Sequence, residues 1–168
     1  EKYCCVVFHV GDVPEGRGGS PIQNHIARGV YETFLSAIKV DGGIDTGPVY
    51  GKWPVSLRHG TVEEILLAVS EIIFHCAIPF IVQKKPAPIA QSDKGSFFSR
   101  RTPSDGDMSS LSSLDQVYDW IRMLDGTGYP PAFLDIGPFH LEFSRVSKRS
   151  GEVLADVRFS LRRDETDE

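Results

Sequence analysis

The sequence predicts an α/β fold in which parallel strands are joined by a crossover helix, followed by a small β-rich unit. Two apolar runs, Tyr3 to Phe8 and Phe34 to Val40, are separated by a stretch with helical character. A strand–helix–strand connection of this length is normally parallel and right-handed. Near the C-terminus, three short stretches with alternating apolar residues predict a small antiparallel sheet or partly open barrel.

The helix between the two apolar runs has a clear start signal. Ser20 occupies the N-cap position, Pro21 the first helical position, and Gln23 completes a capping box. Apolar residues then recur at a spacing of four, at Ile22, Ile26 and Val30. One face of this helix is therefore expected to cover the sheet.

The remaining elements follow from caps, breakers and periodicity. Residues 48–57 predict an edge strand, because Pro54 interrupts the apolar pattern. A second helix begins after Thr61, and Pro79 is expected to kink or end it. Ser113, with Gln116 three residues on, caps a third helix. The C-terminal strands are expected at Ala132 to Ile136, His140 to Val146 and Val153 to Phe159.

These elements divide the chain into three parts. Residues 1–83 are the expected C-terminal part of an α/β domain, and residues 113–168 a small helix plus antiparallel β unit. Residues 84–112 are rich in Pro, Ser, Gly, Lys and Arg, which predicts a surface linker.

Two observations indicate that the chain is a fragment. It lacks an initiator Met and opens almost directly into an apolar strand. Two strands and one helix bury too little surface for a stable sheet. We expect upstream sequence to supply more strands, the alternative being a complete but reduced form. Targeting signals are then not predictable.

Composition disfavours several function classes. A formal charge of -5 and a pI near 5.5 provide no general attraction for nucleic acid, and residues 65–82 are broken by polar residues and Pro79, which predicts no membrane span. The cysteines and histidines lack metal-ligand spacing, so no metal site is expected. Free cysteines favour a reducing, cytoplasmic location. Oligomerisation is left open.

His9 and Asp45 are the candidate catalytic residues. His9 ends the first apolar run, and Asp45 lies in the Gly-rich loop after the second. If the strands are parallel, both residues reach the same sheet edge, where ligands of α/β proteins bind. Histidine can carry protons near neutrality, and a carboxylate can orient it. The structural alternative is a half-buried strand terminator beside an ordinary turn.

Arg17 is a candidate contact for substrate or another anion. It lies in a Gly-Arg-Gly-Gly turn leading into the N-terminus of the first helix. Free N–H groups and the helix dipole favour anions there, and a guanidinium adds donors. A tight turn that requires small residues explains the glycines equally well.

The order of these motifs resembles the formyltransferase family that uses 10-formyltetrahydrofolate. The resemblance is carried by Phe8-His9, Pro14, Arg17-Gly18, Ser20 to Gln23, Glu32-Thr33 and Gly43 to Gly47, and it continues through Phe98 to Pro103 and Val117 to Phe133. It covers most of the chain. It implies a Rossmann-like catalytic domain followed by a smaller barrel-like domain.

The resemblance also implies roles for individual residues. His9 and Asp45 fall on the family's catalytic His and Asp, whereas Val7 replaces its Asn. Loss of one oxyanion donor typically costs about 10²- to 10³-fold in rate. A backbone N–H near Gly11 or the His9 ring is a candidate replacement. The implied folate contacts are Gly11, Asp12, Val13, Pro14, Asp41, Gly42, Gly43 and Ile44.

The implied activity is transfer of a formyl group from 10-formyltetrahydrofolate to a primary amine. The negative charge and the short C-terminal unit favour a small acceptor such as an amino-sugar nucleotide. Methionyl-tRNA is the second candidate acceptor. A non-catalytic descendant that binds folate or a partner is the alternative from another class, because Val7 lacks the amide.

Overall fold

The computed structural model describes residues 4–92 and 94–162, which form two compact units. The first unit comprises residues up to Gly60 together with Glu64–Arg101, and the second comprises Thr61–Glu63 and residues from Thr102 on. The predicted linker, 84–112, therefore contributes to both units. Tyr3, in the first predicted strand, and 163–168, in the predicted C-terminal unit, lie outside the described residues.

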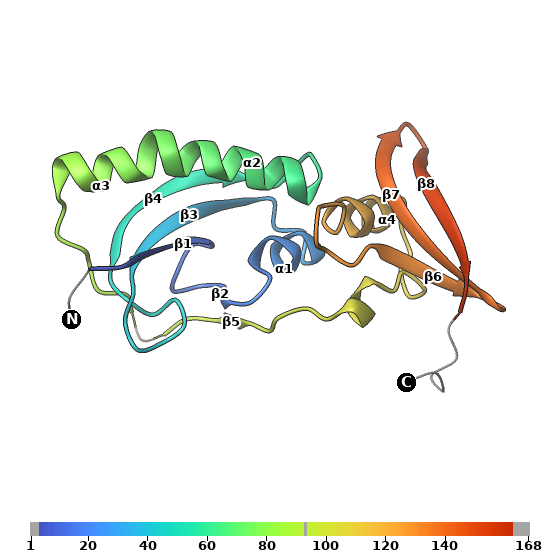
Figure 1. The fold of residues 1–168 in the computed structure, drawn as a ribbon, viewed down its shortest axis with the longest axis horizontal. Coiled ribbons are helices and arrows are strands. Elements are labelled where there is room, and N and C mark those ends of the chain that lie inside the picture. The colour runs from blue at the N-terminus through green and yellow to red at the C-terminus, as the bar shows by residue number, and fades with distance from the viewer. Residues whose placement is uncertain (1–3, 93, 163–168) are drawn as a thin grey trace. The chain divides into compact units, whose positions relative to one another are not determined.

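The main sheet of the first unit has three strands, and all its pairs are antiparallel (Figure 1). The strands are β1 (Val6–Val10), β3 (Glu32–Lys39) and β4 (Val49–Ser56), in the order β1-β3-β4. Buried residues from the sheet form much of its core, namely Val10, Leu35, Ile38 and Val55. The predicted edge position of the 48–57 strand is confirmed.

The predicted parallel pairing with a crossover helix is wrong, and helix length explains why. Helix α1 (Pro21–Ala27) has seven residues and spans about 10 Å, whereas the eight-residue β3 spans about 27 Å. Such a short helix does not carry the chain back to the start of β1. The chain instead enters β3 at the end where β1 finished, so Leu35 pairs with Val10 and Lys39 with Val6.

The start of α1 is correctly located, but Ser20 does not cap it. Ser20 has a left-handed backbone conformation, with φ 48°, and makes no side-chain cap hydrogen bond. Its Oγ instead accepts a hydrogen bond from the Arg101 backbone N–H at 3.1 Å. The hydroxyl therefore fastens the segment after β5 (Phe97–Phe98) rather than the helix end.

The second predicted helix continues past Pro79. It comprises α2 (Val62–Ile72), the π-helical segment η1 (Ile73–Ala77) and α3 (Ile78–Lys84). Proline lacks an N–H and its ring clashes with the carbonyl four residues earlier in an α-helix. The wider π turn immediately before Pro79 provides room for this ring, so the helix continues.

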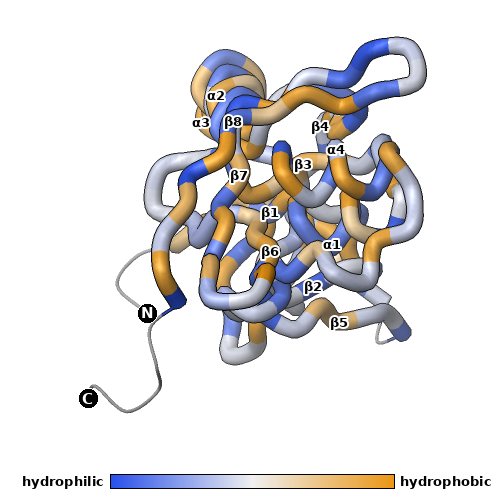
Figure 2. Tube along the Cα trace, turned by 90° about the vertical axis from the view of Figure 1, so that its right-hand side faces the viewer, coloured by the Kyte–Doolittle hydropathy of each residue, from blue (hydrophilic) through white to orange (hydrophobic). Residues whose placement is uncertain are grey.

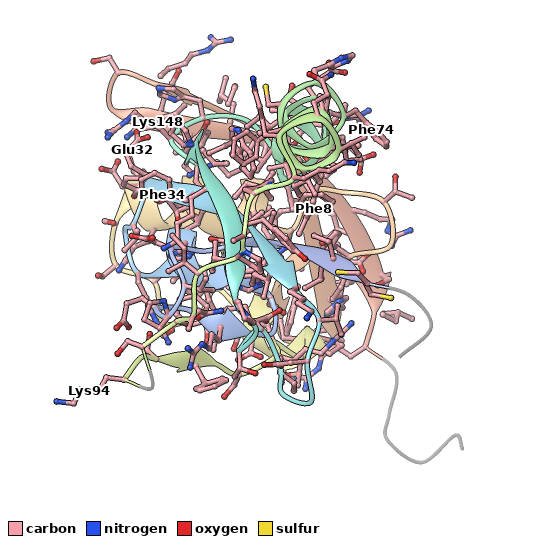
Figure 3. The ribbon with its side chains drawn as sticks, turned by 90° about the vertical axis from the view of Figure 1, so that its left-hand side faces the viewer. Phe8, Glu32, Phe34, Phe74, Lys94 and Lys148 are labelled. Atoms are coloured by element: carbon pink, nitrogen blue, oxygen red, sulfur yellow. The ribbon has the colours of Figure 1, made fainter. Side chains whose placement is uncertain are left out.

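The resulting stretch, Val62–Lys84, is long and apolar enough to cross a membrane as judged by length and composition. Leu67, Phe74 and Val82 are among its exposed apolar side chains. Figure 3 shows Phe74 on this helix, and Phe8 of β1 on the side of the sheet that faces it. A single helix of this kind is weak evidence for a membrane. The absence of a membrane partner stays a prediction.

The predicted linker contains ordered structure that the sequence does not signal. Its Phe97–Phe98 strand, β5, pairs in parallel with β2 (Arg17–Gly18), and a 3-10 helix, η2 (Pro103–Gly106), follows. Gly18 has φ 97°, and a Cβ there would lie 2.5 Å from the carbonyl oxygen of Phe98. The glycine therefore permits the two backbones to approach closely.

The second unit matches the predicted helix and antiparallel strands. It contains α4 (Leu114–Arg122), β6 (Ala132–Ile136), β7 (Phe139–Arg149) and β8 (Glu152–Leu161), and its sheet order is β6-β7-β8. Hydrophobic and hydrophilic segments alternate along these strands (Figure 2). Such alternation is typical of a sheet with one covered and one solvated face.

The Ser113 cap provides a local test of this unit. Its side chain accepts a hydrogen bond from Gln116 N at 3.2 Å, as the sequence predicts. Ser113→Ala is expected to lower the free energy of unfolding by about 1 kcal/mol, because one helix N–H loses its partner. Urea titration measures this change. The exposed Ser110→Ala is the control, and an equal effect of the two substitutions would contradict the capping role.

Candidate functional site

His9 and Asp45 lie together in the first unit. The distance from His9 Nδ1 to Asp45 Oδ2 is 3.3 Å, and the two side chains are 6% and 13% exposed. β3 runs away from His9, but the loop after β3 turns back toward it. In this loop, Asp45 Oδ2 accepts a hydrogen bond from the Gly18 N–H at 2.9 Å. The predicted proximity is therefore confirmed, although the strand topology expected to produce it is wrong.

The other ring nitrogen of His9 is also held. Nε2 lies 2.8 Å from the carbonyl oxygen of Gly16. A carbonyl only accepts hydrogen bonds, so Nε2 carries the hydrogen in this arrangement. Nδ1 faces a carboxylate, which also accepts. The two contacts together suit a ring protonated on both nitrogens, and Asp45 supplies the compensating negative charge.

The Asp45 backbone is clamped by a glutamine from the predicted linker. Gln91 Nε2 donates to the carbonyl oxygens of Asp45, at 2.9 Å, and Gly47, at 2.7 Å. Asp45 has φ 56°, a left-handed conformation that costs free energy for a residue with a Cβ. Sequence reasoning missed Gln91, since a polar residue between prolines and serines carries no periodic signal.

Arg17 makes contacts inside the protein. It is 5% exposed, its Nε and Nη2 donate to Gln91 Oε1 at 3.1 and 2.8 Å, and Nη2 also donates to the Ser92 carbonyl at 3.0 Å. Its guanidinium lies 5.5 Å from the centroid of the Phe97 ring. Binding of an anion by Arg17 stays a prediction, and the structure shows a different use for its donors.

The first predicted folate segment, residues 11–14, forms a turn beside His9. A Cβ on Gly11 would lie 2.7 Å from His9 Nε2, so this position requires glycine. Asp12 pairs with Lys52 Nζ at 2.5 Å, and the same Nζ donates to the Val13 carbonyl at 2.6 Å. Val13 and Pro14 line a cavity of about 340 Å³ together with residues 49–52 and 89–92.

The second predicted folate segment, residues 41–44, lies in the exposed loop between β3 and β4. Asp41 Oδ1 accepts hydrogen bonds from Gly43 N and Thr46 Oγ1, at 3.0 and 2.8 Å, and these bonds hold the pKa of Asp41 below its ordinary value. Ile44 is 70% exposed. Residues 41–44 do not line the 340 Å³ cavity, so a shared folate site for both segments stays a prediction.

Val7 is the residue that the family resemblance predicts in place of the catalytic asparagine. It lies two residues before His9 on β1, so both side chains are on one face of the strand. It is 38% exposed and has no polar side-chain atom. The Gly11 N–H, one suggested replacement for the missing donor, already donates to the Phe34 carbonyl at 2.7 Å. The His9 ring, the other suggested donor, also has a partner at each nitrogen, Asp45 Oδ2 at 3.3 Å and Gly16 O at 2.8 Å.

The chain shares sequence and fold with a protein of known structure, the methionyl-tRNA formyltransferase from Clostridium thermocellum. The two are 49% identical, with a TM-score of 0.91, over 95% of this chain and 70% of that one.

The chain belongs to the formyltransferase family.

Other comparisons agree with this membership. The family model for the methionyl-tRNA formyltransferase C-terminal domain matches residues 103–160, within the second unit of this formyltransferase-family chain. The methionyl-tRNA formyltransferase of Campylobacter curvus is 28% identical over 154 residues, which are 89% of this chain and 50% of that protein. The chain thus spans about half the length of the curated relatives it matches.

More distant structures share the fold alone. HypX from Aquifex aeolicus in complex with tetrahydrofolic acid matches with 15% identity and a TM-score of 0.68, over 86% of this chain and 26% of that one. A 4-N formyltransferase from Francisella tularensis matches with 15% identity and a TM-score of 0.63, over 96% and 64% of the two chains. The Rossmann-like part of the family fold is not evident in the antiparallel main sheet.

His25 of this formyltransferase-family chain is a buried histidine near His9 that sequence reasoning left without a role. It lies on α1, 8% exposed, with its ring edge-on to Phe98 at 5.0 Å between centroids. Its Nε2 has no hydrogen-bond partner among residues 4–92 and 94–162. Burial, and then the charges of His9 and Arg28, lower the pKa of His25.

This lowered pKa predicts acid destabilisation of the first unit. The unfolded chain binds a proton at His25 more readily than the folded protein does, so stability is complete above about pH 6.5 and falls below it. The free energy of unfolding, measured by urea titration from pH 8 to 5, should decline less steeply in His25→Gln. The exposed His75→Gln is the control. Equal slopes in all three proteins would contradict the prediction.

No metal centre is evident in the part of the chain that the structure describes. Within it, no group of three or more His, Cys, Asp or Glu side chains is arranged to hold a metal ion. Cys4, Cys5 and Cys76 are free and exposed.

Proposed function

We propose that the complete natural protein transfers a formyl group from 10-formyltetrahydrofolate to a primary amine, and that it does so in the cytoplasm. The observation that carries this proposal is the His9–Asp45 contact at 3.3 Å in a chain 49% identical to a methionyl-tRNA formyltransferase. The folate supplies the formyl carbon. Residues 11–14 and 41–44 are the proposed folate contacts, since they border the His9–Asp45 pair in sequence; Asp12 and residues 41–44 are exposed, whereas Gly11 and Val13 are buried.

His9 is the proposed proton-transfer group. In the overall reaction the amine nitrogen forms a bond to the formyl carbon, the bond from that carbon to the donor nitrogen breaks, and one proton passes from the amine to the released nitrogen. Both ring nitrogens have partners, so one contact must open for this exchange, and the Nδ1 contact at 3.3 Å is longer than the Nε2 contact at 2.8 Å. Positioned acid–base groups contribute about 10²- to 10⁴-fold in rate.

Asp45 is the proposed partner of His9. Its carboxylate stabilises the protonated ring, and the Gly18 N–H at 2.9 Å fixes the position of Oδ2. The pair is largely excluded from water, which strengthens the attraction between the two charges. The carboxylate is held from three directions, by His9, by Gly18 and through its own backbone by Gln91.

Val7 sets a limit on the rate. Without an asparagine amide, the oxyanion formed on the formyl carbon has one donor fewer than in the usual family site. We propose that the protonated His9 ring stabilises this oxyanion. Val7→Asn should then raise turnover, whereas a non-catalytic descendant would show no turnover with either residue.

Methionyl-tRNA is the proposed acceptor. The relatives from Clostridium thermocellum and Campylobacter curvus are methionyl-tRNA formyltransferases, and the second unit matches the C-terminal domain model of those enzymes. The amino-sugar acceptor favoured from sequence charge has no specific support, because the N-formyltransferase structures that match this chain at 14% to 17% identity show the fold alone. The amino-sugar acceptor stays a prediction that rests on the net charge of -5.

The test measures tetrahydrofolate release from 10-formyltetrahydrofolate by the complete natural protein. Methionyl-tRNA and a nucleotide-linked amino sugar are compared as acceptors, each at two salt concentrations. Turnover with methionyl-tRNA that falls steeply with salt supports the proposal, because phosphate contacts release counterions. Turnover with the amino sugar alone would overturn the proposed acceptor. Folate binding without turnover, with or without Val7→Asn, would overturn the proposed enzyme.

A further inference from the structure

Gln91 bridges the candidate catalytic loop and Arg17 through both ends of its side-chain amide. Nε2 donates to Asp45 O and Gly47 O, and Oε1 accepts two bonds from Arg17. The orientation of the amide is fixed by chemistry, since a guanidinium only donates and a carbonyl only accepts. The opposite orientation would place the NH₂ group against Arg17 and the oxygen against two carbonyl oxygens.

The loop that carries Asp45 needs such an anchor. Residues 40–48 form no helix or strand, and residues 41–43 are exposed. Asp45 itself has the disfavoured φ of 56°. The loop end approaches β3 closely, because a Cβ on Gly47 would lie 1.8 Å from the Lys39 carbonyl oxygen. The two bonds from Gln91 hold the loop backbone on either side of Thr46.

Arg17 in turn fixes Gln91. It is buried, and it joins Gln91 Oε1 to the carbonyl oxygen of Ser92, so that the linker segment is held to the turn before α1. Arg17 thus belongs to the same hydrogen-bonded chain that ends at Asp45. Its charge is used within this chain of contacts, which shortens and strengthens the bonds to Gln91.

We propose that Gln91 is a positioning residue that acts through Asp45, with Arg17 holding the Gln91 amide in its working orientation. This inference rests on the proposed formyl transfer for its kinetic consequence. Misplacement of a reacting group by about 1 Å can cost 10²-fold in rate. Gln91 touches neither reacting atoms nor the His9 ring in the structure, and its effect passes through the backbone of residues 45–47.

Two variants distinguish the role of Gln91 in holding the Asp45 loop from its role as hydrogen-bond acceptor for Arg17. Gln91→Ala removes both sets of bonds. Gln91→Glu keeps an acceptor for Arg17 but places a carboxylate oxygen against the carbonyl oxygens of Asp45 and Gly47. We expect kcat to fall about 10- to 100-fold in both variants, with KM for the amine changed less. If Gln91→Glu retained natural kcat, the residue would merely satisfy Arg17 and the proposal would be overturned.

A double-mutant cycle tests whether the effect passes through Asp45. In the Asp45→Asn background, Gln91→Ala should lower kcat by less than about twofold, because the group it positions is already disabled. Equal fold losses in both backgrounds would indicate general structural damage and contradict the proposal. Lys94→Ala is the matched control, since Lys94 is an exposed side chain in the same segment that points away from the protein (Figure 3).

Hydrogen exchange at the Gly18 amide provides a readout that does not depend on activity. This N–H donates to Asp45 Oδ2 at 2.9 Å, so its exchange should accelerate in Gln91→Ala and Gln91→Glu but not in Lys94→Ala. If Gly18 exchange were faster in the two Gln91 variants but the natural protein showed no formyl transfer, the positioning role of Gln91 would stand and the proposed function would be refuted. If both the Gly18 exchange and kcat were unchanged in the Gln91 variants, the positioning role of Gln91 would be refuted.

Discussion

Asp45→Asn is expected to lower turnover of the complete natural protein by about 10²- to 10⁴-fold, with folate affinity retained. The substitution keeps the side-chain size and leaves an oxygen that can accept the Gly18 N–H. It removes the negative charge that faces His9 Nδ1 at 3.3 Å. Oδ2 makes both contacts, so the amide oxygen takes its place and the protonated His9 ring loses its compensating charge. The protonated ring is then less stable, and the proton is held less firmly where the reaction needs it.

The measurement is single-turnover formyl transfer, with folate binding followed separately. Glu32→Gln is the control, because Glu32 is an exposed carboxylate of the same unit that pairs with Arg58 at 3.3 Å. Its turnover should equal that of the natural protein. If Asp45→Asn kept turnover within about twofold, the proposed partnership of Asp45 with His9 would have to be abandoned.

Gly18→Ala is expected to destabilise the protein by about 3 to 5 kcal/mol. The backbone φ of 97° is unfavourable for a residue with a Cβ, at a cost of about 1 to 2 kcal/mol. The added atom would also lie 2.5 Å from the Phe98 carbonyl oxygen, which belongs to backbone and yields little. The β2–β5 pair must therefore separate, and the Gly18 N–H moves away from Asp45.

Gly29→Ala isolates the backbone contribution. Gly29 also has positive φ, at 70°, but nothing lies within 4 Å of its added Cβ. It should cost about 1 to 2 kcal/mol by urea titration, with turnover unchanged. Equal losses of stability in the two variants would show that the contact with Phe98 contributes nothing.

Local signals predicted the elements of this chain better than their pairing. The Ser113 cap and the alternation in residues 132–161 describe interactions between near neighbours, and both are found in the structure. The direction of β3 depends instead on whether the connection is long enough to cross the sheet. The capping signals of α1 mark where the helix begins, while its end after seven residues determines the topology.

The candidate site was likewise predictable where the signal is local and not where it depends on contacts across the fold. His9 and Asp45 were predictable because each stands at the end of an apolar run, and the family motifs lie on the same residues. Gln91 and His25 were not, because their importance comes from contacts across the fold. Gln91 meets Asp45 from 46 residues away, and His25 lies on a short helix whose packing against Phe98 has no trace in periodicity.

The separation between Gln91 and the loop it holds has a consequence for the order of folding. The connections between β1, β3 and β4 are shorter than the sequence separation of the Gln91 contacts, so these strands should pair earlier. The hydrogen bonds of Gln91 to Gly47 and Asp45 connect positions separated by 44 and 46 residues in the sequence. They can form only after α2, α3 and the segment that follows them are in place. We expect pulse-labelled amides of β3 to become protected before that of Gly18. The His9–Asp45 pair would thus acquire its final geometry only after the sheet is complete.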